Sequence, residues 1–393
     1  MRRFERIYDV VEPFEEYRQG GYHPVHLHDV LLHRYEVIGK IAYGQYSTVW
    51  LAKDQLKNSQ QVVLKILKAE ASQDNNRELS ILLTLSDSNI DHPGKKQIVE
   101  LLDHFYTKGP NGTHLCLVFP TTISDGAALT VSGSPREVSY IRAISRQLLL
   151  GLDFLHQSGI VHCDLQPANI LFSMAGGTDM EALLQPPEFS PVKWLGGVTV
   201  DDSAPEYLVP SQKRRGQLSD AHFPTLEVRI GDFGGGKIRM SVSNFVWTAS
   251  LRLTLAQYVQ YCDEKPVTPL GLRAPELFRK TRDTSIDTTL DIWALGCLIF
   301  ALATNEPLFP LDTFGITREE IDNDHGILIE KRLGSNNQDG DFAEYLRERL
   351  PENFGAKNAE SLASFLLLML QIDPRERLSA EQLLQTPFMT DDC

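Results

Sequence analysis

The chain has 393 residues and a formal net charge of −14 at pH 7, with 42% hydrophobic and 23% charged residues. This length suits one bilobed unit or two domains, and the acidic balance argues against a general nucleic-acid binder, because phosphate backbones select basic surfaces. An acidic surface instead permits a basic protein or peptide as a partner.

The cysteines and the N-terminal residues indicate in which cellular compartment the protein is expected. The five cysteines are scattered and include no Cys-x-x-Cys pair, which predicts reduced thiols in the cytoplasm, the nucleus or both. The first residues lack the apolar stretch of a signal peptide. No run approaches the roughly 20 apolar residues of a membrane span. We therefore expect a soluble protein without a membrane partner.

The first third of the chain is predicted to be mainly β. Between residues 34 and 119, short segments rich in β-branched and aromatic residues alternate with polar turns, and one helical pattern at 74–86 interrupts them. The expected strands are "RYEVIGKIA", "STVWLAKD", "QVVLKILK", "QIVELLDHF" and "HLCLVFP". We expect an N-terminal extension at 1–33, followed by a small, mostly antiparallel β lobe with one helix at 34–119.

Helical periodicity dominates after residue 120. Residues 137–157 carry an apolar stripe at helical spacing, which predicts a helix packed against the core. The stripe consists of Ile141, Ile144, Leu148, Leu152 and Leu155. Further helices are predicted at 290–304 and 359–372. We expect a larger, mainly α lobe at 120–388 and a tail at 389–393.

One segment interrupts this lobe. Residues 173–225 contain clusters of glycine, proline and charge, and they separate the strand-like "NILF" from "LEVRIGDF". Such composition predicts a surface insert that is partly disordered.

The stretch "IVHCDLQPANILF" at 160–172 has the spacing of a phosphoryl-transfer loop, with Asp164 and Asn169 between apolar runs. Asp164 can orient a substrate hydroxyl and accept its proton. Asp232, in "IGDFGGGK", follows a predicted strand. Together with Asn169 it offers the oxygen ligands that Mg²⁺ prefers.

A nucleotide site is indicated earlier in the chain. Lys65 ends an apolar strand, where a buried ammonium group needs an anionic partner, and Glu78 on the following helix is the candidate. The loop "IAYGQYSTVW" keeps Gly44, but Ala42 and Ser47 occupy positions that are glycine in G-x-G-x-x-G. Both are small enough for a backbone to approach phosphates, although each restricts φ more than glycine does.

Three further residues are predicted to hold the scaffold. Glu276, in "LRAPELF", is expected to pair with Arg377 in the interior. Asp291 begins an apolar helix, where its carboxylate can accept backbone N–H groups and brace the loop around Asp164.

These motifs, in this order, resemble the eukaryotic protein kinase family from about Tyr35 to Phe388. The opening "GGYHP" at residues 20–24, Ser47 with "STVW", and the insert at 173–225 resemble the serine/arginine-protein kinases. The resemblance implies a bilobed α+β kinase fold that uses ATP and Mg²⁺. It further implies serine or threonine as the acceptor and Arg/Ser-rich proteins, similar to splicing factors, as substrates. We expect a monomer that does not bind nucleic acid directly.

The resemblance also assigns site residues. It implies catalytic roles for Asp164, Lys65 and Gln166, and Mg²⁺ ligands at Asn169 and Asp232. The residues implied to bind the nucleotide are Ile41, Ala42, Gly44, Ser47, Val49, Lys65, Glu78, Phe119, Asn169 and Asp232.

Two departures from the family pattern leave alternatives open. Gln166 occupies the position of a lysine that contacts the transferred phosphoryl group. Because glutamine lacks the positive charge of that lysine, phosphoryl transfer is expected to be slower by about 10²-fold or more. The segment between Asp232 and Glu276 is longer than in the family pattern, and its surplus at residues 237–265 is apolar. These residues can be a genuine insertion, an autoinhibitory plug or a translated intron. The alternatives to a protein kinase are a pseudokinase that binds nucleotide without efficient transfer and a kinase for a small molecule, which the "RAPE" and "DIWALG" elements disfavour.

Overall fold

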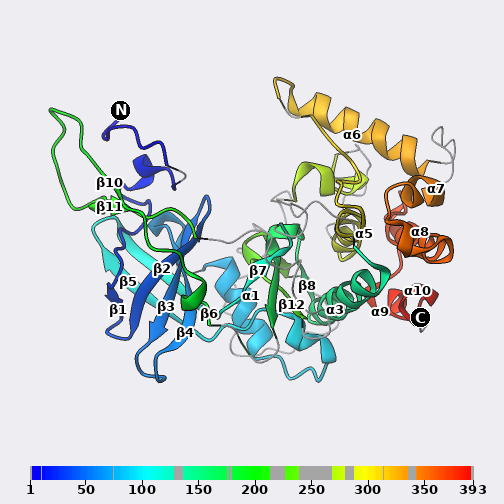
Figure 1. The fold of residues 1–393 in the computed structure, drawn as a ribbon, viewed down its shortest axis with the longest axis horizontal. Coiled ribbons are helices and arrows are strands. Elements are labelled where there is room, and N and C mark those ends of the chain that lie inside the picture. The colour runs from blue at the N-terminus through cyan, green and yellow to red at the C-terminus, as the bar shows by residue number, and fades with distance from the viewer. Residues whose placement is uncertain are drawn as a thin grey trace. The chain divides into compact units, whose positions relative to one another are not determined.

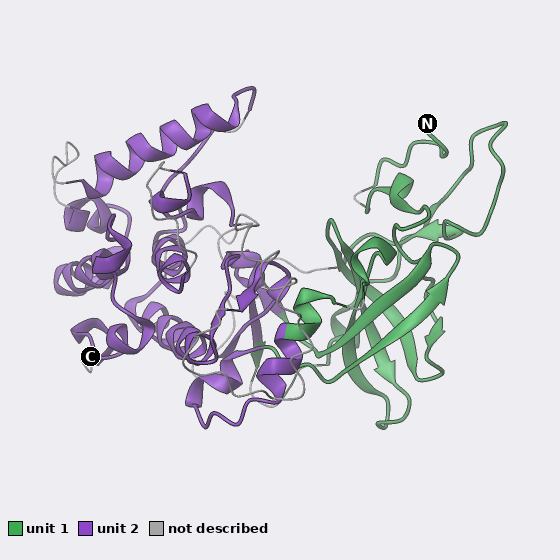
Figure 2. Ribbon diagram, turned by 180° about the vertical axis from the view of Figure 1, so that it is seen from behind, with its two compact units in different colours: residues 1–80, 99–123, 173–214 green, residues 81–98, 124–172, 215–393 purple. Residues whose placement is uncertain are grey.

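The structure is a computed structural model that describes residues 2–9, 11–73, 75–127, 136–174, 177, 179–212, 226–238, 268–278, 287–312, 314–334 and 342–390. Contacts within the chain group it into two units (Figure 2). Unit 1 consists of residues 1–80, 99–123 and 173–214. Unit 2 consists of residues 81–98, 124–172 and 215–393.

Unit 1 is built on a six-stranded sheet in the order β1-β2-β3-β4-β6-β5, in which neighbouring strands are antiparallel (Figure 1). The strands are β1 Val30–Leu31, β2 Tyr35–Tyr43, β3 Ser47–Asp54, β4 Gln60–Leu67, β5 Asp103–Gly109 and β6 Gly112–Pro120. In β4, Val62, Leu64 and Ile66 are buried in the core of this unit while Lys65 is only partly buried. Successive strand residues face opposite sides, so Lys65 leaves the sheet on the face away from that core.

The single helix expected in this region is α1, Arg77–Ser86, and the side chain of Asn76 accepts a hydrogen bond from the backbone N–H of Leu79 at its start. The strand expected at 97–105 begins only at Asp103. Residues Pro93–Gln97 form a short 3-10 helix, and Ile98 makes an isolated bridge with Ile230. The apolar residues before Asp103 are therefore a buried connection, which hydrophobicity alone does not distinguish from a strand.

The N-terminal extension belongs to unit 1. It contributes strand β1 to the sheet and forms a short 3-10 helix, Phe14–Glu16. The described part of the insert up to residue 212 belongs to the same unit, whereas the sequence placed it within the C-terminal lobe. Its strands β10, Ser190–Pro191, and β11, Tyr207–Leu208, pair with each other. Phe4 is fully buried and its ring lies 4.6 Å from that of Trp194, so aromatic packing joins the insert to the N-terminus. Residues 213–225 of the insert lie outside the described residues.

Unit 2 is mainly helical, as expected. Its helices are α3 Val138–Gln157, α5 Thr289–Thr304, α6 Arg318–Leu333, α7 Phe342–Arg347, α8 Ala356–Met369, α9 Ala380–Leu383 and α10 Pro387–Thr390 (Figure 1). All five residues of the predicted stripe on α3 are buried. Helix α5 is buried on nearly all sides, which accounts for its continuous apolar sequence.

Short strands in unit 2 frame two loops. Strands β7 Ser124–Asp125, β9 Ile170–Met174 and β12 Leu226–Ile230 form one sheet in the order β12-β9-β7, and β8 Ile160–Val161 pairs with β13 Lys237–Ile238. The loop 162–169 lies between β8 and β9, and the loop 231–236 lies between β12 and β13. Residues 239–267 lie outside the described residues, so the three interpretations of 237–265 stay open.

The predicted α+β class, a small antiparallel β part and a larger helical part, is confirmed. Among the residues that the structure describes, no helix is long and apolar enough to cross a membrane.

Candidate active site

In unit 1, the expected ion pair between Lys65 and Glu78 is present. The Nζ atom of Lys65 lies 2.8 Å from both Oε1 and Oε2 of Glu78, and the Glu78 side chain is only 5% exposed. Lys65 comes from β4 and Glu78 from the first turn of α1, so the pair fixes the direction of the Lys65 side chain at its strand. A lysine held in this way can contact the phosphates of a nucleotide.

Three candidate nucleotide-binding residues lie in one row across the sheet. Ala42 on β2 pairs with Val49 on β3, and Val49 pairs with Lys65 on β4. Directly paired residues share a face of the sheet, so all three face the same side. Ile41 lies at an irregularity in the β2–β3 register, and Phe119 on β6 pairs with Val63.

The connection between β2 and β3 is a tight, exposed loop. The backbone N–H of Gly44 donates to the carbonyl oxygen of Ser47 at 2.8 Å, which closes the turn. Ser47 is buried, whereas Gly44 is exposed and a Cβ added to it would meet no atom within 4 Å. The loop therefore leaves open space at Gly44 despite having alanine and serine at the two flanking positions.

In unit 2, Asp164 is at the centre of a set of side-chain hydrogen bonds. The amide Nε2 of Gln166 donates to Oδ1 and Oδ2 of Asp164, at 2.9 and 3.0 Å. The amide Nδ2 of Asn169 donates to the backbone oxygen of Asp164 at 2.8 Å and to its Oδ2 at 3.2 Å. The three candidate residues of the loop thus form one cluster with the Asp164 carboxylate as its acceptor.

The pKa of the Asp164 carboxyl is raised above its ordinary value. Burial is the largest cause, and the nearby negative charge of Asp232 acts in the same direction. The hydrogen bonds from Gln166 and Asn169 offset part of this rise in the pKa, because they stabilise the charged form. A carboxylate made more basic in this way is suited to accept a proton from a substrate hydroxyl.

Asp232 is exposed at the start of the loop 231–236, with its backbone in the left-handed region at φ +58°. The residue before it, Gly231, is bonded on both sides. Its N–H donates to the carbonyl oxygen of Asn169 at 2.9 Å, and its own carbonyl accepts Nε2–H of His162 at 3.0 Å. These bonds link Asp232 to the loop that carries Asn169.

The donor set at this point fits Mg²⁺. Asp232 offers a carboxylate, and since Nδ2 of Asn169 is engaged by Asp164, the amide oxygen of Asn169 is the atom suited to a cation. Within the described part of the chain, no group of three or more His, Cys, Asp or Glu side chains forms a metal site. A Mg²⁺ ion held by two protein oxygens needs further ligands, which nucleotide phosphates and water provide.

The predicted brace is confirmed. Asp291, which is 1% exposed in α5, accepts the backbone N–H groups of His162 at 2.8 Å and Cys163 at 2.9 Å. Nε2 of His156 also lies 3.1 Å from its Oδ2. The predicted pair of Glu276 and Arg377 is confirmed as well, with two contacts of 2.6 and 2.8 Å in the interior.

Thr268 is a site residue that the sequence analysis missed. It is buried, and its hydroxyl donates to the backbone oxygen of Cys163 in the loop 162–169. No motif or spacing in the sequence joins Thr268 to a loop 105 residues earlier, so the sequence held no signal for this contact.

The chain is similar to proteins of known family. The family model of the protein kinase domain matches residues 35–182 and 217–389. The chain is 30% identical to "Serine/threonine-protein kinase SRPK" of Physarum polycephalum, over 97% of this chain and 91% of that protein. It is 27% identical to "Protein kinase dsk1" of Schizosaccharomyces pombe, over 98% of this chain and 86% of that protein. It is 36% identical to "SRSF protein kinase 3" of Homo sapiens, over 40% of this chain and 28% of that protein.

Proposed function

Since the chain belongs to the protein kinase family, we propose that it transfers the γ-phosphate of ATP to serine or threonine hydroxyls of Arg/Ser-rich proteins. The observation that carries the proposal is the cluster of Asp164, Gln166 and Asn169, in which a buried carboxylate is oriented by two amide groups. The ion pair of Lys65 and Glu78 supports it from the other unit.

The residues have distinct roles in this proposal. Lys65, oriented by Glu78, binds phosphate oxygens of ATP, and the row of Ala42 and Val49 lines the nucleotide. Asn169 and Asp232 hold Mg²⁺, which neutralises phosphate charge when bound. Asp164 orients the acceptor hydroxyl and takes its proton, aided by its raised pKa.

Gln166 keeps a polar contact where the family pattern has a cation. Its amide donates to both oxygens of Asp164, so it holds the carboxylate in place but adds no positive charge at the phosphoryl group. We therefore propose an active kinase with a slow chemical step. The curated relatives named above are kinases, and no comparison favours a pseudokinase.

The substrate class rests on charge and on the relatives. The chain has 52 acidic and 38 basic residues, a balance that suits an arginine-rich substrate. The name of the human relative refers to SRSF proteins. We further propose that the protein acts as a monomer in the cytoplasm, the nucleus or both, on protein substrates, without binding nucleic acid directly.

The test is transfer of radiolabelled phosphate from Mg²⁺-ATP to an Arg-Ser repeat peptide, with an Arg-Ala repeat as the peptide control. We expect the wild-type chain to label the first peptide only, and Asp164→Asn and Lys65→Met to abolish labelling. An exposed lysine of unit 2 provides the matched control Lys357→Met, which should retain activity. Absence of transfer to this peptide and to a general basic protein, with ATP binding intact, would overturn the proposal in favour of a pseudokinase.

A further inference from the structure

The loop 44–46 between β2 and β3 occupies the place of the glycine-rich loop of protein kinases and takes that name, and it is held through two of its carbonyl groups. The hydroxyl of Tyr22 donates to the carbonyl oxygen of Gly44 at 2.6 Å. The backbone N–H of Lys68 donates to the carbonyl oxygen of Tyr46 at 2.8 Å. Gly44, Gln45 and Tyr46 are all exposed, so packing contributes little to the position of the loop. These hydrogen bonds are therefore well placed to determine it.

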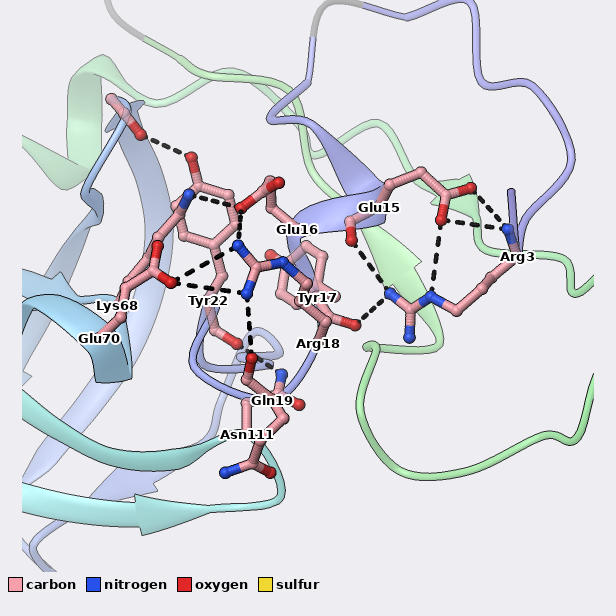
Figure 3. A network of polar contacts seen from close by, with 11 residues as sticks. Arg3, Glu15, Glu16, Tyr17, Arg18, Gln19, Tyr22, Lys68, Glu70 and Asn111 are labelled. Atoms are coloured by element: carbon pink, nitrogen blue, oxygen red, sulfur yellow. Dashed lines mark hydrogen bonds and ion pairs between the residues drawn. The ribbon is translucent and has the colours of Figure 1, made fainter. Parts of the chain in front are cut away.

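Tyr22 is itself rigidly fixed. Its side chain is buried beneath the ammonium group of Lys68, which lies 4.5 Å from the ring centroid and donates to Glu16 at 2.9 Å (Figure 3). The ring of Tyr17 packs against it at 5.6 Å. Burial raises the pKa of Tyr22 to about 12, and the hydroxyl, which is protonated at neutral pH even at the ordinary pKa of tyrosine, is able to donate.

Two glycines bring Tyr22 to this place. Gly20 has φ +82°, and a Cβ on Gly21 would lie 1.8 Å from the backbone oxygen of Glu16. Their carbonyl groups accept the N–H groups of Glu70 and Ala69, at 2.8 and 3.0 Å, just beyond the end of β4. Because other residues would clash or be strained here, the turn requires Gly-Gly immediately before the tyrosine. This explains the "GGY" part of the motif "GGYHP" in structural terms.

Residues of the N-terminal segment and of the insert take part in the hydrogen bonds that hold the segment around Tyr22. The amide Nδ2 of Asn111 donates to the backbone oxygens of Tyr22 and Ser203, each at 2.6 Å. The guanidinium group of Arg3 donates to the backbone oxygen of Tyr17 (Figure 3) and, at 3.2 Å, to the hydroxyl of Ser203. Residues from three distant parts of the sequence thus converge behind the loop.

We propose that Tyr22 is a positioning residue for the glycine-rich loop, through which the N-terminal segment and the insert set the affinity for nucleotide phosphates. The hydroxyl holds the carbonyl of Gly44, and the loop is thereby held in the conformation that accepts the phosphates. This inference rests on the proposed function, because it assigns the loop to ATP.

The experiment compares wild type with Tyr22→Phe, which removes one oxygen atom. Loss of a hydrogen bond of about 0.5–1.5 kcal/mol predicts a rise of about 2- to 10-fold in the Kd for Mg²⁺-ADP and in the KM for ATP. The Kd for adenosine, which has no phosphate, and kcat at saturating ATP are expected to stay unchanged. Calorimetry gives both Kd values without any need for phosphoryl transfer.

Tyr207→Phe is the matched control. The hydroxyl of Tyr207 accepts the backbone N–H of Leu27 at 3.1 Å, so this change also removes a tyrosine hydroxyl that contacts the N-terminal segment, but one that makes no bond to the loop. It should leave both affinities unchanged. If Tyr22→Phe lowers the melting temperature more than this control does, Lys68→Met serves as the second variant, because it keeps the Tyr22 hydroxyl but removes the ammonium group above its ring. Lys68→Met should weaken ADP binding less than Tyr22→Phe does.

The outcomes are separable. Unchanged ADP affinity in Tyr22→Phe, or equal weakening of ADP and adenosine binding in that variant, would overturn the role of Tyr22. A wild-type chain that binds ADP but phosphorylates no peptide would overturn the proposed function alone, since the comparison of ADP affinities still decides the role of Tyr22.

Discussion

The side-chain amide of Gln166 donates a hydrogen bond to each carboxylate oxygen of Asp164, at 2.9 and 3.0 Å. The residue that departs from the kinase pattern is therefore in direct contact with the proposed base. Gln166 orients the carboxylate and lowers its pKa in part, but it carries no charge toward a phosphoryl group.

Gln166→Lys should increase kcat. An ammonium group at this position would stabilise the negative charge that develops on the transferred phosphoryl group, and we expect an increase of about 10- to 100-fold. The measurement is steady-state transfer to the Arg-Ser peptide at saturating ATP. The exposed Gln385→Lys should leave kcat unchanged. An unchanged kcat in Gln166→Lys would show that charge at this position does not limit the chemical step.

Gln166→Leu should move the acid limb of the pH profile. The hydrogen bond from Gln166 stabilises the charged form of Asp164, so its loss raises the pKa of that carboxyl further. Because Asp164 must be ionised to accept a proton, kcat/KM should begin to fall at a higher pH than in wild type as the solution is acidified. Coincident acid limbs in wild type, Gln166→Leu and the control Gln385→Leu would contradict this role of Asp164.

Glu78→Gln should weaken catalysis by releasing Lys65. The neutral amide loses the charge that fixes the Lys65 ammonium group at 2.8 Å, and displacement of a positioning group by about 1 Å can lower kcat/KM by about 100-fold. Steady-state kinetics with ATP as the varied substrate measures this. Glu100→Gln, at an exposed position of unit 1, should have no effect. Equal kinetics for both variants would argue against a role for the ion pair.

Glu276→Gln should destabilise unit 2. Arg377 has a fully buried side chain, and loss of its partner would leave an uncompensated charge in the interior, at a cost of about 3–5 kcal/mol. Urea unfolding followed by far-ultraviolet circular dichroism measures the change. Glu348, whose side chain is 68% exposed and lies 3.6 Å from Arg349, offers the control Glu348→Gln, for which about 1 kcal/mol or less is expected. A similar small effect of Glu276→Gln would mean that water or another group compensates Arg377.

His23 should make stability depend on pH. Its ring lies 4.7 Å from that of His114, and burial, followed by the neighbouring His114, lowers the pKa of His23 to about 4 from 6.5. The unfolded chain binds a proton at His23 that the folded chain excludes. The contribution of His23 to the free energy of unfolding is therefore complete above pH 6.5 and is lost as pH falls toward 4. The loss amounts to about 3 kcal/mol.

The measurement for His23 is the free energy of unfolding between pH 7 and pH 4. His23→Phe keeps an aromatic ring and should reduce the slope over this range, whereas the exposed His104→Phe should retain it. A slope that is the same in His23→Phe and in wild type would rule out His23 as its source.

Much of the site could be predicted from local sequence. The pairs Lys65–Glu78 and Glu276–Arg377 and the brace at Asp291 were all expected, because these residues stand in motifs whose order and spacing resemble those of protein kinases. Helix α3 was also predicted, since its apolar stripe repeats at the helical period. Hydrophobicity failed at residues 98–102, where apolar residues that are buried or partly buried form a connection and not a strand.

The tertiary structure decided what long-range packing controls. The contacts from Tyr22 to Gly44, from Asn111 to Ser203 and from Thr268 to Cys163 join residues 22 to 105 positions apart, and no motif in the sequence specifies these partners. The buried ion pair of Glu12 and Lys40 is of the same kind. Local sequence determines which groups need partners, because burial imposes that need on each residue separately. Only the packing of distant segments determines which partners are within reach.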